Sequence, residues 1–108
     1  MKRLLALICC ATSLHAEQAG WDASSCSMKI GQRTIPLHGT FSAVDSFPDF
    51  TVSVVENFPD LNVLQVENFP DQCGKWQQVS AFADFKIKFV TSFPDLKIKY
   101  VEHFPGVP

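Results

Sequence analysis

The sequence has little positive charge. Its 108 residues include nine lysine and arginine residues against eleven aspartate and glutamate residues, and residues 34–74 contain no basic residue apart from histidine. Proteins that bind nucleic acids carry a basic face, so the composition argues against a nucleic-acid partner. The sequence also lacks an apolar run of the roughly 20 residues that a membrane-spanning helix needs. We therefore predict neither nucleic-acid binding nor a transmembrane segment.

The motifs of common enzymes and cofactor-binding proteins are missing as well. No GxSxG, HExxH, Walker A or GxGxxG pattern occurs, although these patterns position nucleophiles, metal ions and phosphates in large enzyme families. The sequence therefore predicts no catalytic residue, no cofactor and a non-enzymatic protein. A small hydrolase stays open only as a minor alternative, because it needs no more than two carboxyl groups across a cleft.

The first sixteen residues resemble a secretory signal peptide. Lys2 and Arg3 precede a short apolar run, and small residues lead to Ala16, which predicts cleavage between Ala16 and Glu17. Lipoprotein processing at Cys10 is the alternative. Both interpretations predict an exported protein, either periplasmic or secreted. The leader carries two of the basic residues and none of the acidic ones, so its removal would make the protein more acidic.

Cys26 and Cys73 are the two cysteines outside the leader. An isolated pair in an exported chain predicts a structural disulfide. A bond across a loop of this length would stabilise the fold by roughly 4 kcal/mol in the chain-entropy model. A redox-active pair is the alternative, but the two cysteines lack the CxxC spacing that makes a thiol acidic.

An eleven-residue unit occurs six times in the second two-thirds of the chain. Each copy has a valine three positions before a phenylalanine, and Pro-Asp follows the phenylalanine in four copies. A two-residue insertion at residues 73–76 separates the third copy from the fourth. We interpret the repeated phenylalanines as the core of the array; they are Phe47, Phe58, Phe69, Phe82, Phe93 and Phe104.

Each copy divides into a strand and a corner. Residues 86–89 and 97–100 alternate polar and apolar side chains, which is typical of a half-buried strand. Phe-Pro-Asp supplies a turn, because proline presets φ and aspartate can bond its own backbone. One such unit cannot bury itself, so the copies must share a core. The sequence predicts an all-β closed toroid or solenoid over residues 39–108, with a short N-terminal cap at 17–38 in the same domain.

Several of these segments resemble a family of short bacterial repeat proteins of unknown function, the septoil knot family. The resemblance rests on Gly74-Lys75-Trp76, on Ala83-Asp84, and on the KIKFV and KIKYV copies. It implies an all-β toroid in which the chain passes through itself as a knot with seven crossings. Most corners here read Asn/Ser-Phe-Pro-Asp, and only the fourth copy keeps the Ala-Asp of the family pattern. The family supplies no catalytic residues to transfer.

Two groups of residues are candidates for binding. Lys75 and Trp76 lie in the insertion, where a functional loop is expected. The corner aspartates recur at one phase, so a closed array would present them as a row of weak calcium ligands; they are Asp49, Asp60, Asp71, Asp84 and Asp95. The leading hypothesis is a rigid structural or protein-binding module with an unidentified protein partner, and the alternative is a calcium-binding repeat protein.

Overall fold

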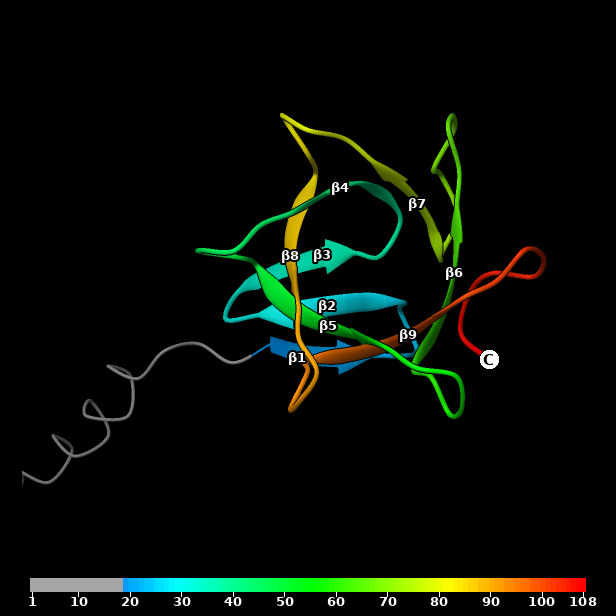
Figure 1. The fold of residues 1–108 in the computed structure, drawn as a ribbon, viewed down its shortest axis with the longest axis horizontal. Coiled ribbons are helices and arrows are strands. Elements are labelled where there is room, and N and C mark those ends of the chain that lie inside the picture. Colours follow the sequence, from blue (N-terminus) through cyan, green and yellow to red (C-terminus); the bar gives the residue numbers. More distant parts are fainter. Residues whose placement is uncertain (1–18) are drawn as a thin grey trace, which may run out of the picture.

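The computed structural model describes residues 19–108, so the predicted signal peptide lies outside the described residues. These residues form nine β-strands without a helix, which confirms the predicted all-β class. None of them belongs to a helix long and apolar enough to cross a membrane. Three strands form an antiparallel sheet, and six form a closed, parallel barrel (Figure 1). The strands of the sheet are β1 (Ala19–Asp22), β2 (Ser27–Ile30) and β3 (Arg33–Pro36).

The barrel strands explain the eleven-residue period. A strand of five residues and a corner of six residues together make one copy, as in β5 and the corner that follows it. The insertion lengthens only the connection before β7. The barrel strands are β4 (Gly39–Ala43), β5 (Phe50–Val54), β6 (Leu61–Gln65), β7 (Lys75–Gln78), β8 (Phe85–Phe89) and β9 (Leu96–Tyr100).

The two halves of the repeat array interleave around the barrel. The strand order is β4-β7-β6-β9-β5-β8, so every strand of the first three copies pairs only with strands of the last three. Consecutive strands such as β4 and β5 lie two places apart in the ring, because one strand of the other half lies between them. The chain thus passes around the ring more than once, and its second passage fills the gaps left by the first.

The barrel core is built from the first and third positions of the strands. These side chains point inward, while the second and fourth positions, mostly polar, point outward, as alternation along a strand requires. Trp76 and Phe85 lie near the centre of an aromatic cluster with ring centroids 5.2 Å apart. The buried barrel residues are Phe41, Phe50, Val52, Leu61, Val63, Trp76, Phe85, Ile87, Leu96 and Ile98.

The prediction that the repeated phenylalanines form the core is wrong. Phe47, Phe58 and their four equivalents are at least 80% exposed, whereas Phe50, three residues after Phe47, is 2% exposed. The reason lies in the phase of the repeat. The phenylalanine lies in the middle of the corner, after one strand has ended and before the chain returns to the barrel, so its side chain lies outside the barrel wall.

The three-stranded sheet caps the barrel at the end where the parallel strands begin. Met28, Ile35 and Leu37 join the barrel residues in one apolar cluster, and the Trp76 indole N–H donates to the Leu37 carbonyl at 3.0 Å. In Figure 1 this sheet lies behind the barrel strands, with β5 crossing in front of β2. The predicted disulfide is confirmed: Cys26 of the cap bonds to Cys73 before β7.

Gly74 allows the chain to close on itself beside the disulfide. Its φ is +87°, and a Cβ at this position would lie 2.5 Å from the Asn62 carbonyl oxygen and from the Gly106 amide nitrogen. Gly106 and Asn62 exchange two backbone hydrogen bonds of 2.8 and 2.9 Å. Only glycine fits this position, because its missing side chain leaves room for the C-terminal segment against β6.

Candidate functional site

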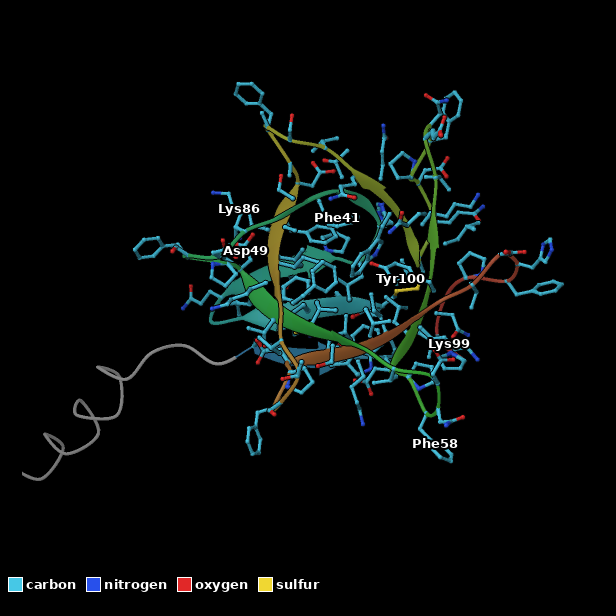
Figure 2. All side chains as sticks on the ribbon, in the orientation of Figure 1. Phe41, Asp49, Phe58, Lys86, Lys99 and Tyr100 are labelled. Atoms are coloured by element: carbon cyan, nitrogen blue, oxygen red, sulfur yellow. A yellow bond between two sulfur atoms is a disulfide. The ribbon has the colours of Figure 1, made fainter. Side chains whose placement is uncertain are left out.

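Six similar corners surround the barrel, and we call them the phenylalanine corners. Figure 1 shows these loops extending outward from the ring in different directions, and Figure 2 shows Phe58 at the tip of one of them. Each corner begins at a valine whose N–H still donates to a neighbouring strand, as Val44 does to Ile87 at 2.8 Å. The phenylalanine corners are residues 44–49, 55–60, 66–71, 79–84, 90–95 and 101–106.

The phenylalanine in each corner adopts a left-handed backbone conformation. All six φ values lie between 51° and 58°, a region that residues other than glycine, asparagine and aspartate rarely occupy. Proline does not impose this conformation, because Phe82 has the same φ with Ala83 after it. The corner itself therefore requires the left-handed residue, and the chain places a large aromatic side chain there instead of glycine.

Exposure and backbone strain thus coincide at six equivalent residues. A left-handed conformation costs a residue other than glycine about 1–3 kcal/mol, and an exposed ring returns almost none of this through burial. Phe82 is fully exposed, and Phe93 is 97% exposed. Such strain persists where the surrounding structure enforces it and is concentrated at functional positions. The rings are the most unusual chemical feature of the described residues.

Aspartates at the ends of four corners fasten those corners to the barrel. The Asp60 N–H donates to the Lys97 carbonyl at 2.8 Å, and the Lys97 N–H donates in return to the Asp60 carboxylate at 2.9 Å. The same pair of bonds joins Asp49 to Lys86. It also joins Asp84 to Thr40 and Asp95 to Thr51. The carboxylate thus accepts a backbone N–H of the neighbouring strand in place of a backbone carbonyl, at the point where the corner joins the next strand.

This arrangement gives the corner aspartates a structural role beside the calcium-binding role that the sequence left open. Four corner aspartates each use a carboxylate oxygen on a backbone N–H of a different strand. The fifth, Asp71, donates its own N–H to the Phe69 carbonyl at 2.9 Å. Within residues 19–108 no three histidine, cysteine, aspartate or glutamate side chains come together as a metal site would require. The aspartates serve separate strands, so they do not converge on one ion.

Asp60→Ala is expected to destabilise the protein by about 1–2 kcal/mol, because the Lys97 N–H loses its acceptor. Asp60→Asn is the matched control, since the amide oxygen can still accept that bond, and its loss should be clearly smaller. Urea denaturation of both variants measures the difference. Equal stability of the alanine variant and the unmodified protein would show that the clamp contributes nothing.

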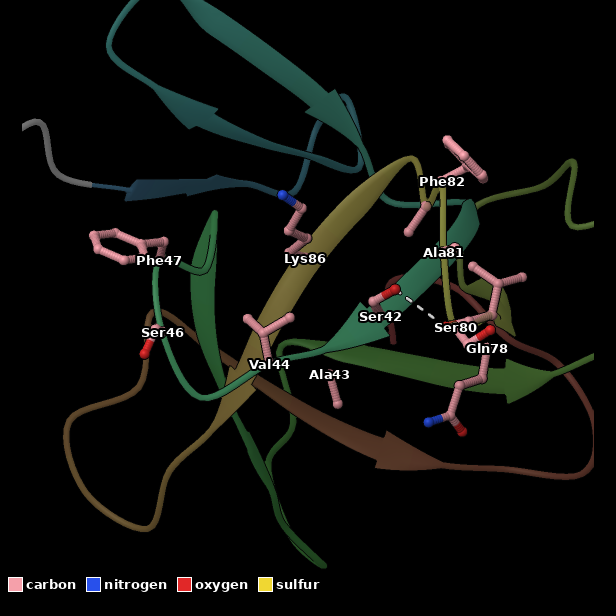
Figure 3. A pocket seen from close by; sticks show the side chains of 12 residues that line it. Ser42, Ala43, Val44, Ser46, Phe47, Gln78, Ser80, Ala81, Phe82 and Lys86 are labelled. Carbon is pink, nitrogen blue, oxygen red and sulfur yellow. Dashed lines mark hydrogen bonds between the residues drawn. The ribbon is translucent and has the colours of Figure 1, made fainter.

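Neighbouring corners enclose shallow grooves on the barrel wall. One of them has a volume of about 840 Å³, and Figure 3 shows Phe47 and Phe82 on its two sides. Its floor is formed by small side chains such as Ala43 and Ala81, and the Ser42 hydroxyl donates to the Val79 carbonyl at 3.0 Å. The corner rings therefore border open surface, and partner atoms could reach both the ring and the groove beside it.

The insertion does not present the binding residue that the sequence suggested. Trp76 is fully buried, because this second residue of β7 has the same place in its repeat, three residues before the valine, as the buried Phe41. Lys75, the other candidate, is half-buried at the start of β7. The insertion is structural: it carries Cys73 and Gly74 and shifts the second passage of the chain by one place in the ring.

Two groups within the described residues have displaced pKa values. The Ser24 hydroxyl and the Lys29 ammonium hold the pKa of the Asp22 carboxyl well below its usual range, and Lys29 lies 3.1 Å from that carboxyl. Burial raises the pKa of the Tyr100 phenol, and a hydrogen bond with Gln65 opposes the shift. Asp22 belongs to the cap sheet and Tyr100 to the barrel, so the two do not form an acid–base pair.

The comparison with protein families agrees with the observed architecture. A family model described as the 7(1) septoil knot domain matches residues 34–108, which include all six barrel strands. The chain belongs to the septoil knot domain family. Among curated proteins no match was found. The closed barrel of interleaved strands is compatible with the knotted fold that the family description names.

Proposed function

We propose that this septoil knot protein is an exported, non-enzymatic module that binds partner proteins through its phenylalanine corners. The observation that carries the proposal is the coincidence of full exposure and left-handed backbone at six phenylalanines. Neither the exposed rings nor the strained backbone contributes to the stability of the isolated fold. A binding partner that covers the rings would account for both.

The directions of the corners favour several contacts over one. The corners extend outward around the ring (Figure 2), so a single flat surface cannot reach all of them. A cluster of rings on one face would suit a bilayer, whereas separate tips suit pockets on several partner molecules. Repeated contacts of one type also raise the overall affinity through effective concentration. The module would thus connect partner molecules and act structurally in the cell envelope.

The proposed cellular location rests on the same cysteine pair that the sequence analysis used. The disulfide between Cys26 and Cys73 is consistent with an oxidising compartment, and we propose the periplasm or the exterior of a bacterium. A closed barrel with a capped end and a disulfide holds the corners at defined positions. Such a scaffold limits the entropy lost when a corner is bound.

Replacement of all six corner phenylalanines by asparagine should abolish partner binding while the fold remains. Asparagine tolerates the left-handed conformation, so the thermal midpoint should stay close to that of the unmodified protein. The measurement is a crosslinking pulldown with tagged protein in envelope extract from the native host. A second variant replaces Phe47, Phe58 and Phe69 but keeps the other three phenylalanines. Its affinity should fall strongly, because the loss of half the contacts removes much of the gain from multivalent binding.

The control variant keeps all six rings and changes another residue of a phenylalanine corner. Thr91→Ala alters the fifth corner without removing a ring, and it should capture the same partners as the unmodified protein. Capture of the same partners by the six-asparagine variant would contradict the proposal. Recovery of only the protein itself by both proteins would indicate a self-associating role instead.

A further inference from the structure

Within residues 19–108 no segment covers the end of the barrel opposite the cap. The last residue of each barrel strand, which is the fifth in every strand but the four-residue β7, lies at this open end, and in the five-residue strands it has the same inward phase as the buried first and third positions. Val54 is 49% exposed, Phe89 is 42% exposed and Tyr100 is 38% exposed, whereas Val52 and Ile87, two residues earlier on their strands, are fully buried. We call this surface the mouth; its residues are Ala43, Val54, Gln65, Gln78, Phe89 and Tyr100.

The mouth is apolar on one side. The strand order places β9, β5, β8 and β4 next to one another, so Tyr100, Val54, Phe89 and Ala43 form a continuous arc. Gln65 and Gln78 occupy the remaining two strands, and Gln65 bonds the Tyr100 phenol. An exposed apolar surface with a polar border is typical of an interaction site.

Acidic residues surround the mouth. The second residue after each fifth position is the first solvent-exposed residue of the corner, and it is acidic in four of the six copies: Asp45, Glu56, Glu67 and Glu102. The ion pairs of the described residues involve other carboxylates, namely Asp22 and Asp49. The rim of the mouth therefore carries uncompensated negative charge.

The lysines of the array do not neutralise this rim. They occupy second and fourth positions, which face outward from the barrel wall, and the strand residues paired with them are uncharged. The aspartates that bond their backbones, Asp49 at Lys86 and Asp60 at Lys97, end the corners and do not belong to the rim. Lys86 lies beside Ser42 and Lys88 beside Thr51. Lys97 and Lys99 lie beside Ser53 and Asn62 in the same manner. The lysines thus lie on the outer wall of the barrel, whereas the charged residues on the rim of the mouth are all acidic.

We propose that the mouth binds a cationic, amphipathic protein segment. Apolar side chains of that segment would cover Phe89, Val54 and Tyr100, and its lysine or arginine residues would lie against the acidic rim. Two copies of this chain cannot dock mouth to mouth without bringing their acidic rims together. An anionic bilayer would be repelled by the same charge. The proposal does not depend on the corner phenylalanines, whose rings extend into solvent, although the rim carboxylates belong to the same corners.

The test uses two synthetic peptides of equal length, one of leucine and lysine and one of leucine and glutamate, both patterned as amphipathic helices. Fluorescence anisotropy of the labelled peptides measures binding to the mature, disulfide-bonded protein at low salt. The lysine peptide should bind with a Kd below about 100 μM, and its affinity should fall with added salt. The glutamate peptide should not bind in this range.

Two variants connect the binding to the mouth. The rim variant Asp45→Asn, Glu56→Gln, Glu67→Gln, Glu102→Gln keeps size and polarity, and it should bind about tenfold more weakly. Val54→Lys places a positive charge in the apolar arc and should weaken binding at least as much. The six-asparagine corner variant should bind the peptide unchanged, which separates this site from the proposed function.

Each remaining outcome overturns the proposal. Equal binding of the glutamate peptide would show that charge does not select the partner. Unchanged affinity in a folded rim variant would place the peptide elsewhere on the protein. Absence of binding by the lysine peptide up to about 1 mM, or self-association that Val54→Lys abolishes, would show that the mouth does not recognise a cationic segment.

Discussion

Phe50→Ala should destabilise the protein by about 3–5 kcal/mol, whereas Phe47→Ala should change its stability by less than about 0.5 kcal/mol. Phe50 is buried at the start of β5, and its ring centroid lies 5.7 Å from that of Phe85. Truncation removes that contact and leaves a cavity that the closed barrel cannot easily collapse. The Phe47 ring contacts mainly solvent, so its removal costs no burial.

Chemical denaturation monitored by circular dichroism measures the free energy of unfolding of both variants. Because both replace phenylalanine by alanine, the difference between them reflects position alone. A third variant, Phe47→Gly, tests the backbone strain directly. Glycine relieves the left-handed strain of the corner but increases the entropy of the unfolded chain, so its stability should be equal to or slightly above that of Phe47→Ala. Comparable losses for Phe47→Ala and Phe50→Ala would show that the corner rings belong to the core, as the spacing alone suggested.

Removal of the disulfide should have the second large effect. The Cys26→Ser, Cys73→Ser variant is expected to lose roughly 2–4 kcal/mol, because the bond closes a loop between residues 47 positions apart in the sequence and limits the unfolded chain. The cap should remain attached in the folded state, since Leu37 still accepts the Trp76 indole N–H and the Gly74 amide.

The midpoint of thermal unfolding, measured with and without dithiothreitol, provides the comparison. Reductant should lower the midpoint of the unmodified protein to that of the double-serine variant and leave the variant itself unaffected. A double-serine variant with an unchanged midpoint would mean that the bond holds the cap without limiting the unfolded state. The two measurements therefore distinguish a stabilising cross-link from a passive one.

The all-β class, the period of eleven and the cysteine pair were available from the sequence because they depend on local or composition-level rules. The alternation of polar and apolar residues from Lys86 to Phe89 predicts a strand whatever its neighbours in the fold, and Phe-Pro-Asp predicts a corner in the same way. The repeat implies a shared core because one unit is too small to fold alone. The resemblance to the septoil knot family favoured the toroid over a solenoid and implied a knot, and the match over residues 34–108 confirmed the family.

A closer reading of the alternation could have located the core. Phe50 and Val52 repeat as Leu61 and Val63, and again in β8 and β9, at positions that one face of a strand would share. The corner phenylalanine occurs in all six copies, whereas the buried strand positions vary among several apolar residues. The phenylalanine was therefore the more obvious candidate for the core. Their neighbours, asparagine or serine before and proline after, are residues of turns, and this was the signal that they lie outside.

The sequence by itself determined that this protein contains six strand-and-corner copies with one cysteine pair outside the leader, because strand alternation, turn chemistry and repeat length are properties of neighbouring residues. Only the tertiary structure decided which face of each copy is buried, since that depends on the ring order β4-β7-β6-β9-β5-β8, in which every strand pairing joins strands from different halves of the array. The same closure carries the six phenylalanines outward, buries Trp76, separates the corner aspartates onto different strands and gathers Val54, Phe89 and Tyr100 at one open end.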